Sequence, residues 1–159
     1  MKIFGKSLSE YLIFEKWFLV LILVVGLTRL VLSLFGVPAS IDKFFSLTVL
    51  FLLGMVFYSI TVHKSGFGSY KQLLPVIALP VILGSAIIVG GIVLAILTNR
   101  DNIFSTPEFS PGRVDGKTWV HAGSHCVAAI IISLVLWGLG CLLMLATKKL
   151  AGGETKRPA

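Results

Sequence analysis

Four long runs of apolar side chains divide the chain, and short polar segments separate them. The runs cover residues 17–35, 44–62, 74–97 and 126–145, and charged side chains are almost absent from them. A helix of about 20 apolar residues crosses a hydrocarbon core of about 30 Å. Backbone groups find no water inside a bilayer, so such runs must fold as helices. The pattern therefore predicts an all-α integral membrane protein with four transmembrane helices in a single antiparallel bundle.

The segments between the runs predict where the helices begin. Residues 1–16 are an interfacial lead-in in which Ser7 and Glu10 have the spacing of a capping box, so the first helix should start near Ser7. Ser40 is the expected N-cap of the second helix. Pro75 suits the first turn of the third helix. Backbone N–H groups in the first turn make no intrahelical hydrogen bond, so proline, which lacks this group, loses none there.

A single transmembrane domain, residues 17–147, accounts for most of the chain. Its longest polar loop covers residues 98–116, and a basic tail of residues 148–159 follows it. Hydrophobic residues make up 56% of the sequence and charged residues 13%, against about a quarter charged in soluble domains. No phosphate-binding glycine loop, nucleophile elbow or paired CxxC motif occurs, so no catalytic residue is assigned and an enzyme is not favoured.

Positive charges beside the apolar runs predict the orientation. Alternate segments place nine basic residues on one side, namely Lys2, Lys6, Lys16, Lys64, Lys71, Lys148, Lys149, Lys156 and Arg157, and four on the other, namely Lys43, Arg100, Arg113 and Lys117. Cytoplasmic segments are enriched in Lys and Arg, so both termini should be cytoplasmic, and the composition is that of a bacterial inner-membrane protein. Topology also accounts for the net charge of +7, so nucleic-acid binding is not expected.

His121 and His125 stand where the longest polar loop meets the last apolar run. Residues four apart share one face of a helix, and two imidazoles so placed can hold one metal ion. Asp115 is a candidate third ligand on the same side of the membrane. The pattern predicts, as an alternative function, a redox or sensor protein that binds a metal ion or haem. Two other interpretations stay open, namely amphipathic rings at the membrane interface and pH sensing.

Arg29 lies inside the first apolar run, where a charge costs at least about 2.5–3.5 kcal/mol. All seven carboxylates are predicted to lie outside the apolar runs, so no acid is expected at its depth. One interpretation is contact with a lipid phosphate, a quinone carbonyl or a haem propionate, with Ser33 one turn away, which would suit a small anion or lipid transporter. The other is an arginine that extends outward to Ser33 or to loop carbonyls.

Small residues on the helices favour close helix packing. They are Gly84, Gly91, Ala95, Gly138 and Gly140. Small side chains let membrane helices approach each other closely. Together with the missing catalytic set, they favour a non-catalytic small subunit or stabilising partner of a membrane complex. The partners expected on this interpretation are the lipid bilayer and either a second protein or further copies of the chain.

Overall fold

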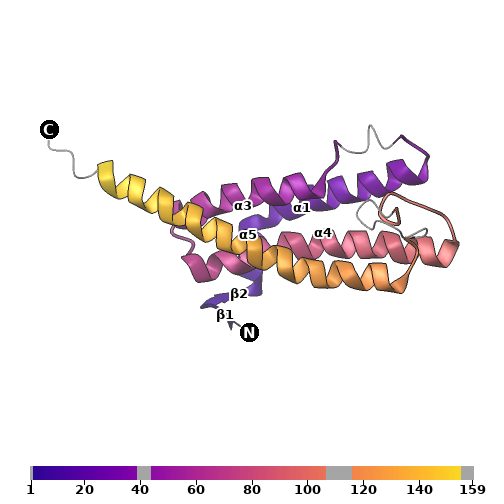
Figure 1. The fold of residues 1–159 in the computed structure, drawn as a ribbon. Coiled ribbons are helices and arrows are strands. Elements are labelled where there is room, and N and C mark those ends of the chain that lie inside the picture. Colours follow the sequence, from indigo (N-terminus) through magenta and orange to yellow (C-terminus); the bar gives the residue numbers. More distant parts are fainter. Residues whose placement is uncertain (1, 39–43, 107–115, 155–159) are drawn as a thin grey trace.

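The computed structural model describes residues 2–38, 44–106 and 116–154, with residues 150–154 described by their backbone only. The described residues form two short strands and four helices: β1 (Lys2–Ile3), β2 (Lys6–Ser7), α1 (Leu8–Leu34), α3 (Leu47–Lys64), α4 (Tyr70–Thr98) and α5 (Trp119–Glu154). The helices run along one common axis, and the N-terminal strands and the far end of α5 lie toward the same end of the bundle (Figure 1). Both α3 and α4 contact each of the other three helices, and the most extensive contact in the bundle is that between α4 and α5.

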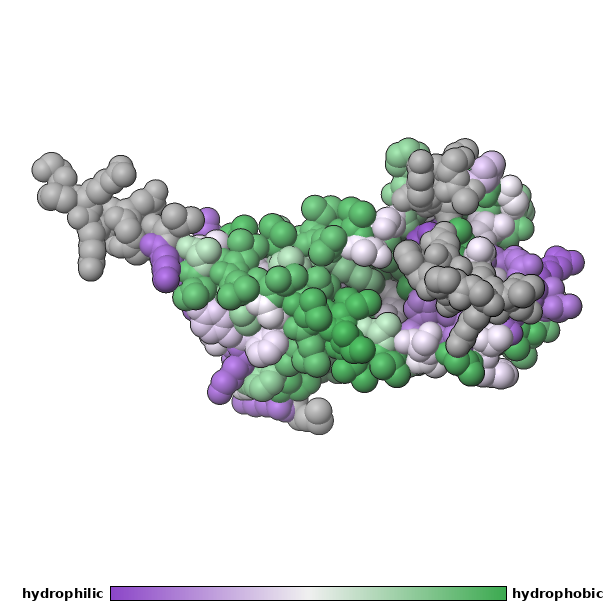
Figure 2. Space-filling model, viewed as in Figure 1, coloured by the Kyte–Doolittle hydropathy of each residue, from purple (hydrophilic) through white to green (hydrophobic). Residues whose placement is uncertain are grey.

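Each of the four helices is long and apolar enough to cross a membrane. Hydrophobic side chains cover the middle of the visible face, and hydrophilic ones gather toward the two ends (Figure 2). Large apolar side chains such as Val24, Phe57 and Ile130 are exposed on the outside of the helices, where the tails of a bilayer can cover them. The predicted fold class, an all-α membrane protein built as a four-helix bundle, is confirmed.

The chain begins with a small hairpin in front of α1. β1 and β2 pair antiparallel, and Phe4 and Gly5 between them have φ angles of 50° and 89°. Positive φ at both turn residues gives the twist that suits a two-residue hairpin. The Tyr11 hydroxyl donates to the Ile3 carbonyl at 2.9 Å, and the Gln72 side chain donates to the Phe4 carbonyl at 2.7 Å. These bonds fasten the hairpin to α1 and α4.

Capping side chains fix where the helices begin. The Ser7 hydroxyl accepts from the Glu10 N–H at 3.3 Å, and the Glu10 carboxylate accepts from the Ser7 N–H at 2.7 Å, so the predicted capping box is confirmed. The N-cap of α3 is Ser46 rather than the predicted Ser40, which lies outside the described residues. Pro75 lies inside α4 and not in its first turn, because α4 begins earlier than predicted.

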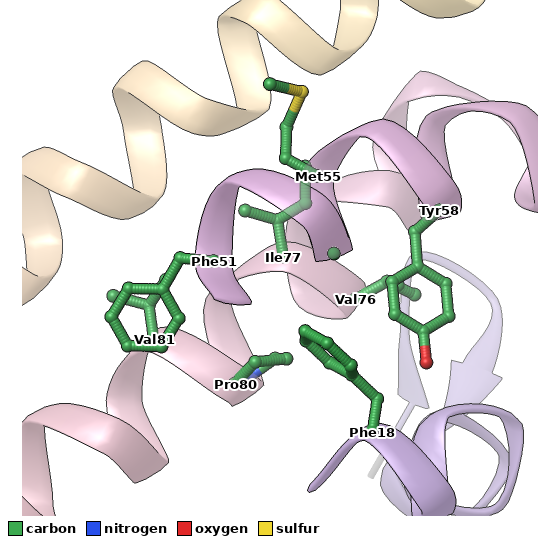
Figure 3. Close-up of a pocket in the computed structure, with 9 residues that line it drawn as sticks. Phe18, Phe51, Met55, Tyr58, Val76, Ile77, Pro80 and Val81 are labelled. Atoms are coloured by element: carbon green, nitrogen blue, oxygen red, sulfur yellow. The ribbon is translucent and has the colours of Figure 1, made fainter. Parts of the chain in front are cut away.

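Aromatic side chains fill the interior between α1, α3 and the start of α4. Phe14 stacks on Phe67 with ring centroids 3.8 Å apart, and Phe18 meets Tyr58 edge-on at 5.6 Å. Phe18, Tyr58 and Pro80 are among the residues around a void of about 10 Å³ (Figure 3). That volume barely reaches the space that one water molecule needs, so this part of the bundle is closed to larger ligands.

Candidate functional site

A cavity of about 540 Å³ lies between the helices at the end of the bundle where α1 ends and α3 begins. Residues of all four helices and of the segment after α4 line it: Arg29, Leu47, Thr48, Phe51, Leu52, Ser85, Ile88, Ile103, Phe104, Thr106, His121, Ser124, His125, Ala128, Ile132 and Leu136. Most of this lining is apolar, and the described residues of the wall include no Asp or Glu. The arginine and the histidine pair, which are separate candidates in the sequence, face the same cavity.

Arg29 reaches the cavity from near the end of α1, and its side chain is half-buried. Its guanidinium carbon lies 5.7 Å from the centre of the Phe104 ring, within the range of a cation–π interaction. Phe104 is itself buried, so this face of the guanidinium is shielded from water. An anionic group would interact with the cation more strongly here than at an open surface, because the surroundings are less polar than water.

The segment after α4 folds back and forms one wall of the cavity. The Asn102 amide donates to the Gly91 carbonyl at 2.7 Å, and its oxygen accepts from the Phe104 N–H at 2.9 Å. The Ile103 N–H donates to the Ser33 hydroxyl at 2.7 Å. These bonds hold Ile103 and Phe104 against α1 and α4. Ser33, predicted as an anion contact, supports this wall and is not among the residues that line the cavity.

His121 and His125 lie on successive turns of α5, and both are half-buried. The Nδ1 atom of His121 lies 2.8 Å from the Gly116 carbonyl oxygen, which can only accept, so this nitrogen carries a hydrogen. In the neutral ring the Nε2 atom is then an acceptor. It lies 3.3 Å from the Nε2 atom of His125, which must therefore donate. One tautomer is thereby assigned to each neutral ring.

The third ligand predicted for these histidines, Asp115, lies outside the described residues. Within residues 2–38, 44–106 and 116–154, no three side chains of His, Cys, Asp or Glu are close enough to hold a metal ion together. Asp101, another acid at this end, forms an ion pair with Lys117 at 3.0 Å. The described structure thus brings two metal-ligating side chains, and not three, to the cavity.

Glu15 is a buried ionisable residue, and its burial was not predicted from the apolar and polar runs of the sequence. Its side chain is fully buried on the face of α1 that also holds Tyr11 and Ile22. Neither of its carboxyl oxygens has a hydrogen-bond partner among the described residues. Glu15 precedes the first apolar run, as the sequence shows, yet the bundle buries it. Its position four residues after Tyr11 and seven before Ile22, on one helix face, was the available signal.

The small residues predicted for helix packing lie mostly inside the bundle: Gly84, Gly91, Ala95 and Gly140 are buried, and Gly138 is exposed. A Cβ atom on Gly84 would lie 2.5 Å from the Phe51 ring, and one on Gly140 would lie 2.7 Å from the Ser59 hydroxyl. These glycines therefore admit side chains of neighbouring helices of the same chain. Gly138 faces open space on the outside of α5.

Comparisons of the chain with known protein families, with curated proteins and with solved structures find no match. The interpretation of the site therefore depends on its geometry and chemistry. The described residues place one guanidinium and two imidazoles on a cavity whose remaining wall is mainly apolar. Such a wall suits a ligand that is apolar over most of its length and polar at one end.

Proposed function

We propose that this membrane protein binds a small amphipathic anion, with an acidic headgroup on an apolar body, in the cavity beside Arg29. The observation that carries the proposal is the composition of the wall, where a half-buried guanidinium stands among mainly apolar side chains around about 540 Å³. That volume falls within the range of about 300–1,000 Å³ that is usual for small-molecule sites.

The two parts of the wall suit the two parts of such a ligand. A guanidinium binds a carboxylate or a phosphate through paired N–H groups, so Arg29 would hold the headgroup. Ser85 and Thr48 offer further hydroxyl groups on the wall. The side chains of Ile132 and Leu136 on α5 offer an apolar surface for the body of the ligand. Burial of that body would contribute about 25 cal/mol for each Å² removed from water.

This proposal takes the place of the non-catalytic subunit as the leading interpretation. The expectation of a protein partner depended on the missing catalytic set and on small-residue helix faces, and four of the five small residues are buried in the bundle. Gly138 remains as an exposed small residue of that set. The alternative hypothesis is transport of an anion or lipid. The cavity supports one step of that hypothesis, the binding of the ligand.

We further propose that the cavity lies at the outer face of a bacterial-type inner membrane and that both termini are cytoplasmic. The support is the distribution of basic residues in the sequence, nine in the terminal segments and the α3–α4 connection against four in the two other loops. The ligand would then enter from the outer leaflet or from the space outside the membrane.

The test is photo-crosslinking of full-length protein in lipid nanodiscs with a diazirine-bearing dodecanoic acid. We expect the label on residues of the cavity wall, with competition by dodecanoic acid and dodecyl phosphate but not by dodecanol. Replacing Arg29→Gln should reduce labelling at least about tenfold, because a charge-assisted pair of hydrogen bonds contributes on the order of 1.5–3 kcal/mol.

The matched control is Arg100→Gln, which removes the same charge from an exposed position at the same end of the bundle. Its labelling should equal that of the wild type. Equal losses in the two variants would show only general attraction of anions to a basic surface and would overturn the proposal. Labelling that survives Arg29→Gln unchanged would overturn it as well.

A further inference from the structure

We infer that His121 and His125 together bind one divalent transition-metal ion at the wall of the cavity. Imidazole is a good ligand for zinc, copper and nickel ions, and two histidines one helical turn apart form a natural chelating pair. The inference concerns a second site on the cavity and does not depend on anion binding at Arg29. It depends on the positions of the ring nitrogens and on what surrounds them.

The separation of the two rings fits a shared ion. Zinc lies about 2.0–2.1 Å from each histidine nitrogen, and two such bonds at a tetrahedral angle place the nitrogens roughly 3.3–3.4 Å apart. The observed distance between the Nε2 atoms of His121 and His125 is 3.3 Å. The ring planes are tilted by 46° with centroids 5.0 Å apart, so the rings are not stacked face to face. An ion could therefore bind with little movement of either ring.

His121 is held as ligating histidines usually are, by a bond from the nitrogen that does not face the metal. Its Nδ1–H donates to the Gly116 carbonyl at 2.8 Å, which leaves the Nε2 lone pair toward its neighbour. Gly116 is buried, and a Cβ atom there would collide with the Ser105 carbonyl, so glycine is required at this position. The close contact of Gly116 with Ser105 keeps the carbonyl in place for His121.

Metal binding would replace the hydrogen bond between the two rings. In the metal-free pair, the Nε2–H group of His125 donates to His121. On binding, the hydrogen of His125 moves to its Nδ1 atom and both Nε2 lone pairs face the ion. Both rings stay neutral, so the exchange requires no net release of a proton.

The remaining coordination positions would face the cavity. Two histidines supply half of a tetrahedral shell, and no third ligating side chain stands with them among the described residues. Water or an exogenous anion can occupy the remaining positions, as in metal sites that keep open positions. The ion would add positive charge to a wall whose described residues include no acid.

The test is titration of full-length, chelator-treated protein without a histidine tag by Co²⁺ in mild detergent. We expect one Co²⁺ per chain, with the visible absorption bands of a nitrogen-ligated ion, and displacement by Zn²⁺. His125→Ala should weaken binding at least about tenfold, since it removes one of two protein ligands. The His121–Gly116 bond is left intact in that variant, so its thermal unfolding should stay near that of the wild type.

His63→Ala is the matched control. His63 lies in the last turn of α3, roughly 24 Å along that helix from Leu47 at the cavity. Binding should be unchanged in this variant. Equal losses in His63→Ala and His125→Ala, or no stoichiometric Co²⁺ binding by the wild type, would overturn the inference. In Arg29→Gln the Co²⁺ spectrum should persist while anion labelling falls, so failure of either site can be recognised separately.

Discussion

Two ionisable side chains of α1 have very different surroundings. Arg29 is half-buried, faces a cavity large enough for a ligand and lies beside the Phe104 ring. Glu15 is fully enclosed by the bundle and does not line that cavity. A buried polar group without a hydrogen bond destabilises the folded state, and a buried unpaired charge does so more strongly. Arg29 is therefore the residue that we propose for anion binding, and we expect Glu15 to destabilise the folded state.

Replacing Glu15→Leu should raise the thermal stability of the protein in detergent. Leucine has a similar volume and removes two oxygens that lack partners among the described residues, for a gain of about 1–3 kcal/mol. Glu10→Leu is the contrasting control, because it breaks the capping box with Ser7 and should cost about 1 kcal/mol. Thermal unfolding followed by circular dichroism measures both. A loss of stability in Glu15→Leu would mean that the carboxyl group makes a stabilising interaction.

The candidate residues Arg29, His121 and His125 could be predicted from local sequence signals. An arginine within an apolar run and two histidines four apart are visible without a structure. Their meeting at one cavity could not be predicted, because it depends on bonds between distant residues, such as Ile103 to Ser33. No periodic pattern in the sequence predicts that the segment after α4 folds back into the bundle.

At the scale of elements, α4 and the segment that follows it determine the shape of the cavity. The Gly91 carbonyl accepts from Asn102 at 2.7 Å, and the missing side chain of Gly91 leaves space for Phe104. A Cβ atom on Gly91 would lie 2.6 Å from the Phe104 ring and 3.4 Å from Leu30. Because Phe104 also lines the cavity beside Arg29, this close approach links helix packing to the proposed binding site.

Gly91→Ala should therefore destabilise the protein by about 1–3 kcal/mol and reduce anion labelling, because the new methyl group displaces the Phe104 ring. The neighbouring Gly90→Ala is the matched control, since a Cβ atom there meets nothing within 4 Å. It should leave labelling unchanged and add up to about 1 kcal/mol through better helix propensity. Thermal unfolding and photo-crosslinking of both variants measure the two effects. Equal stability and equal labelling of the two variants would show that the Phe104 ring can move without effect and does not position the ligand.

At the scale of the whole molecule, the bilayer makes the fold predictable. Lipid forces every long apolar run into a helix, so the number of helices follows from the runs alone. Helix ends are less predictable, because polar residues beside an apolar run can belong to the helix, as Tyr70, Lys71 and Gln72 do at the start of α4. The hairpin before α1 depends on contacts with α4, such as that from Gln72, and no local pattern shows them.

Reporter fusions in a bacterial host test the proposed orientation of the whole molecule. Green fluorescent protein at the C-terminus should fluoresce, and alkaline phosphatase fused after Asn99 should be active, because its disulfides form only outside the cytoplasm. Phosphatase fused after Ser65, between α3 and α4, is the control and should be inactive. The reverse pattern would place the cavity at the cytoplasmic face, so its anion would come from inside the cell while the geometry of the site stayed the same.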